Sequence, residues 1–138
     1  MRARTFLGVI LVVAGLGSGT LAASDHGMRH ARQWAVVYLA QPTLIGSTIV
    51  QGPVLFTHDP AKMALGEPCT SVRLVEPATG PIEEIASFHC VARQGKVANH
   101  FTLTTSPNVR DGYGCVLIAY QFAGDREIHG VPATAEGH

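Results

Sequence analysis

The feature that most constrains the fold is the regular placement of turn residues between short apolar runs. Beyond residue 32, clusters of Gly, Pro, Asn and Asp interrupt runs that are rich in Val, Ile, Thr, Phe and Tyr. Side chains of the second group fit a pleated, half-buried surface, whereas Gly and Pro favour turns. The pattern predicts an all-β fold, an antiparallel β-sandwich or small barrel of about seven strands. The expected strands are 33–39, 44–50, 54–58, 69–75, 82–93, 100–105 and 115–122, and only residues 60–65 are expected to form a helical turn.

Alternation within these runs predicts which side chains face the core. The run 115–122 is apolar on both faces, so we expect it to be a central strand. In the run 82–93, Phe88 and Cys90 share one face. Trp34 begins the first run and is expected to anchor the core or a sheet edge.

The N-terminus has the composition of an export signal. Arg2 and Arg4 precede an uncharged apolar run at 6–16, and small residues follow it up to Ala22 and Ala23. This order is typical of a secretory signal, and the run is shorter than the roughly 20 residues of a spanning helix. We therefore expect export to the periplasm or the extracellular space, with no stable membrane span after cleavage. The expected segments are a signal peptide at 1–23, a polar lead-in at 24–32 and a single β-rich domain at 33–138.

The charge balance argues against a nucleic-acid partner. The 138 residues include 10 Lys and Arg against 10 Asp and Glu, without a basic run. Loss of Arg2 and Arg4 with the signal leaves the domain slightly acidic. Because nucleic-acid binding normally needs a basic surface, we expect the partner to be a protein or a small molecule.

Three cysteines in an exported chain predict one disulfide and one free thiol. If the strands on either side of a turn at 77–80 form a hairpin, Cys69 lies nearly opposite Cys90. We therefore expect a Cys69–Cys90 disulfide, with Cys115 as a buried thiol. The alternative is a Cys90–Cys115 bond between strands that face each other.

Seven histidines in a chain of low charge raise a metal-binding hypothesis, with copper or zinc as the alternative to having no cofactor. None of them shows the close paired spacing of a structural zinc site. The candidates lie on different runs, and the ligand set would be a subset of His58, His89, Cys90, His100 and His129.

The expected mature N-terminus offers a separate metal site. Cleavage after Ala23 leaves a chain that starts Ser24-Asp25-His26. A free amine, two amides and the His26 imidazole would then supply a square-planar set of nitrogens to Cu²⁺ or Ni²⁺. A flexible polar tail is the alternative interpretation.

No catalytic pattern is complete. The sequence lacks a nucleophile elbow, a phosphate loop, a dinucleotide fingerprint and a Cys-x-x-Cys motif. Adjacent Glu83 and Glu84 point to opposite faces of a strand, so they cannot act as a facing acid and base. We therefore expect a non-enzymatic protein with no catalytic residues.

The segment after residue 125 is the least generic part of the chain. Arg126 and Glu127 precede His129, and Gly130 and Pro132 then end the segment. One interpretation is a polar binding groove in which Arg126 and Glu127 orient His129. The other is a return strand with surface charges that closes the sheet.

Together these patterns favour an exported binding or interaction module of the bacterial envelope or extracellular space. A periplasmic copper or zinc protein that uses its histidines is one alternative. A structural or self-associating secreted protein is the other.

Overall fold

The structure, a computed structural model, describes residues 31–108, 110, 112, 114–133 and 136–137. The all-β prediction is confirmed for these residues, among which the one helix, the short α2 (Pro60–Ala64), lies in the predicted helical turn. The expected signal peptide, the site at His26 and most of the lead-in fall outside the described residues. Among the described residues, no helix has the length and apolar character needed to cross a membrane. The strands are β1 (Gln33–Ile45), β2 (Thr48–His58), β3 (Thr70–Glu76), β4 (Gly80–Phe88), β5 (Val91–Gln94), β6 (Thr102–Pro107), β7 (Cys115–Gln121), β8 (Glu127–Gly130) and β9 (Glu136–Gly137).

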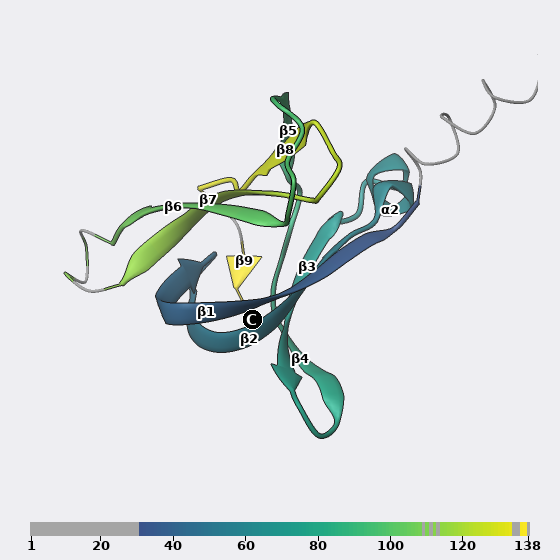
Figure 1. Cartoon of the computed structure of the whole chain (residues 1–138). Coiled ribbons are helices and arrows are strands. Elements are labelled where there is room, and N and C mark those ends of the chain that lie inside the picture. Colours follow the sequence, from purple (N-terminus) through teal and green to yellow (C-terminus); the bar gives the residue numbers. More distant parts are fainter. Residues whose placement is uncertain (1–30, 109, 111, 113, 134–135, 138) are drawn as a thin grey trace, which may run out of the picture.

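The strands belong to one curled sheet that resembles half of a barrel (Figure 1). Its order is β5-β8-β7-β1-β2-β3-β4-β9, and β6 pairs with β7 beside this path. All pairs are antiparallel except β1 with β7, which run parallel at Thr43 with Cys115 and at Leu44 with Val116. The sheet is therefore mixed, and β7 has the central position expected from its apolar faces.

The first hairpin is longer than the turn residues predicted. We expected breaks at Pro42 and Pro53, but β1 and β2 continue through both positions. An irregularity between Leu39 and Thr43 absorbs Pro42, and the turn lies instead at Gly46, which has a φ of 65°. Pro53 lies just beyond the last β2–β3 pair, so its missing N–H is tolerated where the pairing of β2 with β3 has ended.

The β3–β4 hairpin has the predicted register. Thr70 pairs with Phe88 and Val72 with Ala86, as the argument for Cys69 and Cys90 required. The expected single strand 82–93 is divided, because β4 ends at Phe88 and β5 begins at Val91 in another part of the sheet. Cys90 therefore lies in the two-residue link through which the chain crosses from one half of the sheet to the other.

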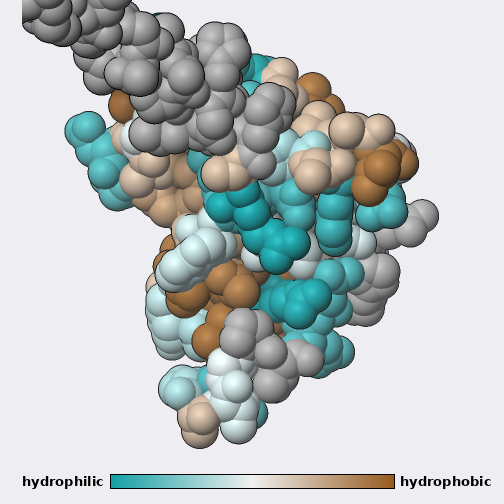
Figure 2. Space-filling view, turned by 90° about the vertical axis from the view of Figure 1, so that its right-hand side faces the viewer, coloured by the Kyte–Doolittle hydropathy of each residue, from teal (hydrophilic) through white to brown (hydrophobic). Residues whose placement is uncertain are grey.

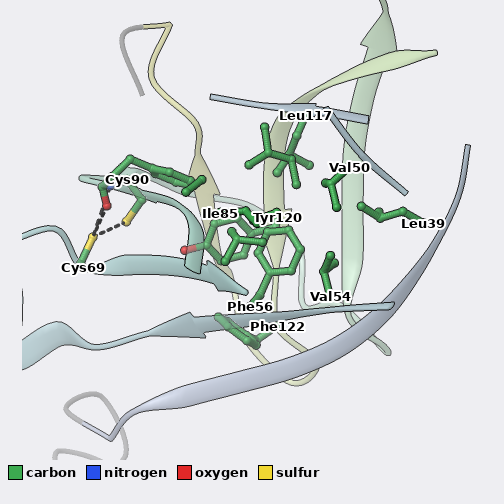
Figure 3. Close-up of a cluster of buried hydrophobic side chains, with 14 residues drawn as sticks. Leu39, Val50, Val54, Phe56, Cys69, Ile85, Cys90, Leu117, Tyr120 and Phe122 are labelled. Atoms are coloured by element: carbon green, nitrogen blue, oxygen red, sulfur yellow. Dashed lines mark hydrogen bonds between the residues drawn. The ribbon is translucent and has the colours of Figure 1, made fainter. Parts of the chain in front are cut away.

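The concave side of the sheet holds the hydrophobic core (Figure 3). Phe56 packs against Tyr120 and Phe101 with ring centroids 5.3 Å apart in each case. Of the two positions expected for Trp34, the core is wrong, because its side chain is 67% exposed. Trp34 lies on β1, whose alternation turns Trp34, Val36 and Tyr38 to the outer side.

Candidate metal centre

The candidate metal centre lies where the two halves of the curled sheet meet. His58 is the last residue of β2, and Cys69 directly precedes β3. The loop between them is closed by the Asp59 N–H, which donates to the Cys69 carbonyl at 2.8 Å. Cys90 lies in the β4–β5 link, and His129 comes from β8. Two hairpins and one crossing segment therefore bring four potential ligands to one place.

Cys90 is at the centre of the group. Its Sγ lies 3.2 Å from Cys69 Sγ, 3.6 Å from His58 Nε2 and 3.4 Å from His129 Nδ1. Figure 3 shows Cys69 and Cys90 facing each other at the edge of the core. The rings of His58 and His129 lie 4.3 Å apart between their centroids.

A fifth potential ligand, Glu127, lies beside His129. Its Oε1 is 3.5 Å from His129 Nδ1, and its side chain is partly exposed. Two overlapping triads result, each with donor atoms within 4.8 Å of one another. One consists of His58, Cys69 and Cys90, and the other consists of His58, Glu127 and His129.

The two imidazoles are buried and only partly satisfied. His58 and His129 are buried, yet His58 Nδ1 and His129 Nε2 have no hydrogen-bond partner among the described residues. Burial, together with the nearby His58, lowers the pKa of His129 to about 4. His129 is therefore neutral at neutral pH, which is the form that binds metal ions.

The two thiols differ in their ionisation. The hydrogen bond from Cys90 holds the pKa of Cys69 well below its ordinary value. The same contact, together with burial, raises the pKa of Cys90. Cys69 is therefore the more acidic thiol of the pair, and the thiolate is the form of cysteine that binds metals and attacks disulfides.

Tyr120 and Thr70 support the centre from the core side. The Tyr120 ring lies nearly parallel to the His129 ring, with centroids 4.8 Å apart and an angle of 14°. The Tyr120 hydroxyl is hydrogen-bonded to the Thr70 hydroxyl, and Thr70 is itself fully buried. These contacts fix the plane of the His129 ring.

The distances in the centre compare closely with those of a tetrahedral zinc site. Bond lengths of about 2.3 Å to sulfur and about 2.0–2.1 Å to nitrogen place neighbouring S and N ligands about 3.5–3.6 Å apart. The two S–N distances at Cys90, 3.6 and 3.4 Å, are close to this value. The S–S distance of 3.2 Å is shorter than the roughly 3.8 Å of a zinc site but far longer than a disulfide of about 2.05 Å.

The predicted Cys69–Cys90 disulfide is therefore not formed in this structure, although the two residues are neighbours as expected. The alternative pair, Cys90 and Cys115, is not brought together. Cys115 is a buried free thiol beside Thr43 Oγ1. It lies at the opposite end of β7 from Tyr120, about 17 Å away at the usual rise of a strand.

The other residues predicted for metal or ligand binding have different positions. His89 and His100 are exposed and lie outside both triads, whereas His58 and His129, the other two histidines of the expected ligand set, belong to them. In the expected groove, Arg126 is exposed, whereas His129 points into the core and is fully buried. Glu127 is the member of that group that lies beside His129.

Sequence reasoning did not assign Cys69 or Glu127 as metal ligands. The hairpin register that placed Cys69 opposite Cys90 contained the necessary signal, since two adjacent thiols can share a metal ion as well as form a disulfide.

Comparisons with protein-family models, with curated proteins and with solved structures found no match to this chain.

Proposed function

We propose that this protein binds a thiophilic metal ion, Zn²⁺ or Cu⁺, through Cys69, Cys90 and His58, with His129 as the fourth ligand. The observation that carries the proposal is the position of Cys90 Sγ, within 3.6 Å of a second thiol and of two imidazole nitrogens. Thiolate and imidazole are the ligands that both ions prefer.

Burial of these groups supports the same conclusion. Placing polar side chains in a protein interior is costly unless they are hydrogen-bonded or bound to a metal. His58 and His129 each leave one ring nitrogen without a partner among the described residues. The other ring nitrogen of each histidine faces Cys90 Sγ. A bound cation would compensate this cost, because the two thiols and the two imidazoles would all coordinate it.

The location of the centre suggests what the metal would do for the fold. His58 and Cys69 belong to the β2–β3 hairpin, whereas His129 belongs to β8 in the other half of the sheet. A metal ion would therefore tie the two halves together where they are joined by the β4–β5 link. We expect the role to be binding rather than turnover, in a mature domain exported from the cell.

The interaction module favoured by the sequence remains a separate prediction. The feature that fits it is the exposed row Trp34, Val36 and Tyr38 on the outer side of β1. Hydrophobic patches among hydrophilic ones are also visible on the face drawn in Figure 2. The proposal of a metal centre does not depend on the exposed row on β1.

The test is metal binding by the reduced, folded protein. Zn²⁺ is titrated against a chromophoric chelator, and native mass spectrometry counts the ions. We expect one ion per chain and a loss of affinity of about tenfold or more for Cys90→Ser and His58→Ala. Cys115→Ala and His89→Ala are matched controls and should bind like the parent chain. Absence of a stoichiometric ion, or unchanged binding by Cys90→Ser, would contradict the proposal.

A further inference from the structure

We propose that oxidation of Cys69 and Cys90 to a disulfide exchanges one metal site for another. The reduced protein uses the thiolate set described above, and this inference rests on that proposed function. The oxidised protein instead binds a divalent first-row transition ion through His58, His129 and Glu127. Two imidazoles and one carboxylate form a set that suits harder ions and leaves coordination positions open for water or a further ligand.

The two triads overlap in a way that makes them alternatives. His58 belongs to both triads, so a single ion position cannot be complete in both at once. His129 Nδ1 lies 3.4 Å from Cys90 Sγ and 3.5 Å from Glu127 Oε1. The same nitrogen therefore faces a thiol on one side and a carboxylate on the other.

Glu127 is held in place by the turn that precedes β8. Its backbone N–H donates to Asp125 Oδ1 at 3.0 Å, and Asp125 Oδ2 accepts a hydrogen bond from Gln33. Its side chain is partly exposed, whereas Cys69 and Cys90 are buried. The carboxylate set thus opens toward solvent, and the thiolate set lies on the core side.

The oxidation step is a thiol–disulfide exchange with a low-molecular-weight disulfide, RSSR. The Cys69 thiolate attacks one sulfur of RSSR, forms a mixed disulfide and releases RS⁻. Cys90 then gives up its proton, and its sulfur attacks Cys69 Sγ and displaces the second RS⁻. The two cysteines lose two electrons and RSSR becomes two RS⁻, of which one takes the Cys90 proton and the other takes a proton from water. Any metal held by the thiolates is released. The sulfurs need to approach by about 1.2 Å from their present 3.2 Å.

A cavity gives such a reagent access to the pair. It has a volume of about 240 Å³, and Cys69 forms part of its wall. Arg32, Lys62 and Arg73 also line it, with Asp59 as the one acidic residue, so the wall keeps a net positive charge that favours an anionic disulfide. Oxidised glutathione, with its carboxylates, is a suitable reagent for the test.

The experiment measures Co²⁺ binding by the reduced protein and by protein oxidised with glutathione disulfide. Mass spectrometry verifies the loss of two hydrogens, and circular dichroism verifies the fold. We expect a sulfur-to-cobalt charge-transfer band in the reduced form only, and cobalt binding without this band in the oxidised form. Glu127→Gln should lower the affinity of the oxidised form by about tenfold or more, and by more than it lowers the affinity of the reduced form. Glu67→Gln, at an exposed position, is the matched control and should change neither.

A double variant, Cys69→Ala with Cys90→Ala, tests the second set without any oxidation step. We expect it to bind Co²⁺ without the sulfur band, and we expect Glu127→Gln in this background to remove that binding. If the reduced parent chain shows the sulfur band but neither the oxidised chain nor the double variant binds cobalt, the exchange is disproved and the proposed function stands. If the reduced chain binds no cobalt at all, the proposed function fails and the exchange fails with it.

Discussion

Tyr120 and His129 stack with ring centroids 4.8 Å apart and planes inclined by only 14°. They face each other across the β7–β8 pair, where they occupy opposite positions of the register. Both side chains are fully buried, so the stack joins the aromatic core to the candidate metal centre. Substitutions at Tyr120 should therefore affect both stability and metal binding.

Tyr120→Phe should destabilise the fold while keeping the stack. It removes the hydrogen bond to Thr70 and leaves that buried hydroxyl with only a long contact to Cys69 Sγ at 3.8 Å, which costs about 1–3 kcal/mol. Urea unfolding of the metal-free protein measures this change. The matched control is Tyr38→Phe at a position 70% exposed, where we expect a change within about 0.5 kcal/mol. Equal changes in the free energy of unfolding for the two variants would argue against the hydrogen bond between the Tyr120 and Thr70 hydroxyls.

Acid should destabilise the reduced, metal-free protein through His129. The pKa of His129 is about 4 in the folded protein, because of burial, and near 6.5 when unfolded. Between these values the unfolded chain binds a proton that the folded chain does not. The free energy of unfolding therefore falls as the pH decreases from about 6.5 to about 4, by on the order of 3 kcal/mol.

Urea unfolding between pH 7.5 and 4 measures this dependence. His129→Gln should flatten the profile, and His89→Gln, at an exposed position, should not. The carboxylates are present in all three proteins, so the difference between profiles reports His129 together with its electrostatic effect on Asp125. A profile for His129→Gln that matches the parent chain would contradict the prediction.

The all-β class and the β3–β4 register were predictable because both depend on local patterns. Turn residues mark the hairpin near residue 80, and alternation places Phe88 and Cys90 on one face. The parallel contact of β1 with β7 was not predictable in this way. It depends on strands separated by some 70 residues, and no local pattern specifies such a pairing.

The candidate site was predictable only in part for the same reason. The sequence indicated His58, Cys90 and His129 as members of a possible ligand set, but it also included His89 and His100. To choose the correct histidines, one would have to know that the predicted strand 82–93 is divided at Cys90. That division turns the chain toward β8, so it decides which histidine meets the thiol pair.

Gly114→Ala should disrupt the entry to β7. Gly114 has a φ of 76°, and a Cβ there would lie 2.3 Å from the Pro42 carbonyl oxygen, which is backbone and cannot move aside easily. Gly112 has a φ of 65° but nothing within 4 Å of the same position. Both substitutions pay the strain of a positive φ, about 1 kcal/mol, and only Gly114→Ala adds the clash. We expect Gly114→Ala to lower the midpoint of urea unfolding clearly more than Gly112→Ala, and equal midpoints would contradict the close approach to Pro42.

Metal binding should raise the free energy of unfolding of the reduced protein, and it should do this by linking the two halves of the sheet. A ligand that binds only the folded state raises the free energy of unfolding by about 2.7 kcal/mol at a free concentration 100 times its Kd. Urea unfolding with buffered Zn²⁺, against the same protein with a chelator, measures this increase. Cys90→Ser should lose it, while His100→Ala, altered at an exposed histidine, should keep it. Because His129 connects β8 to ligands from the β2–β3 hairpin, amide exchange in β8 should slow most when zinc is added. Stabilisation that leaves β8 unchanged would mean that the ion is held without His129.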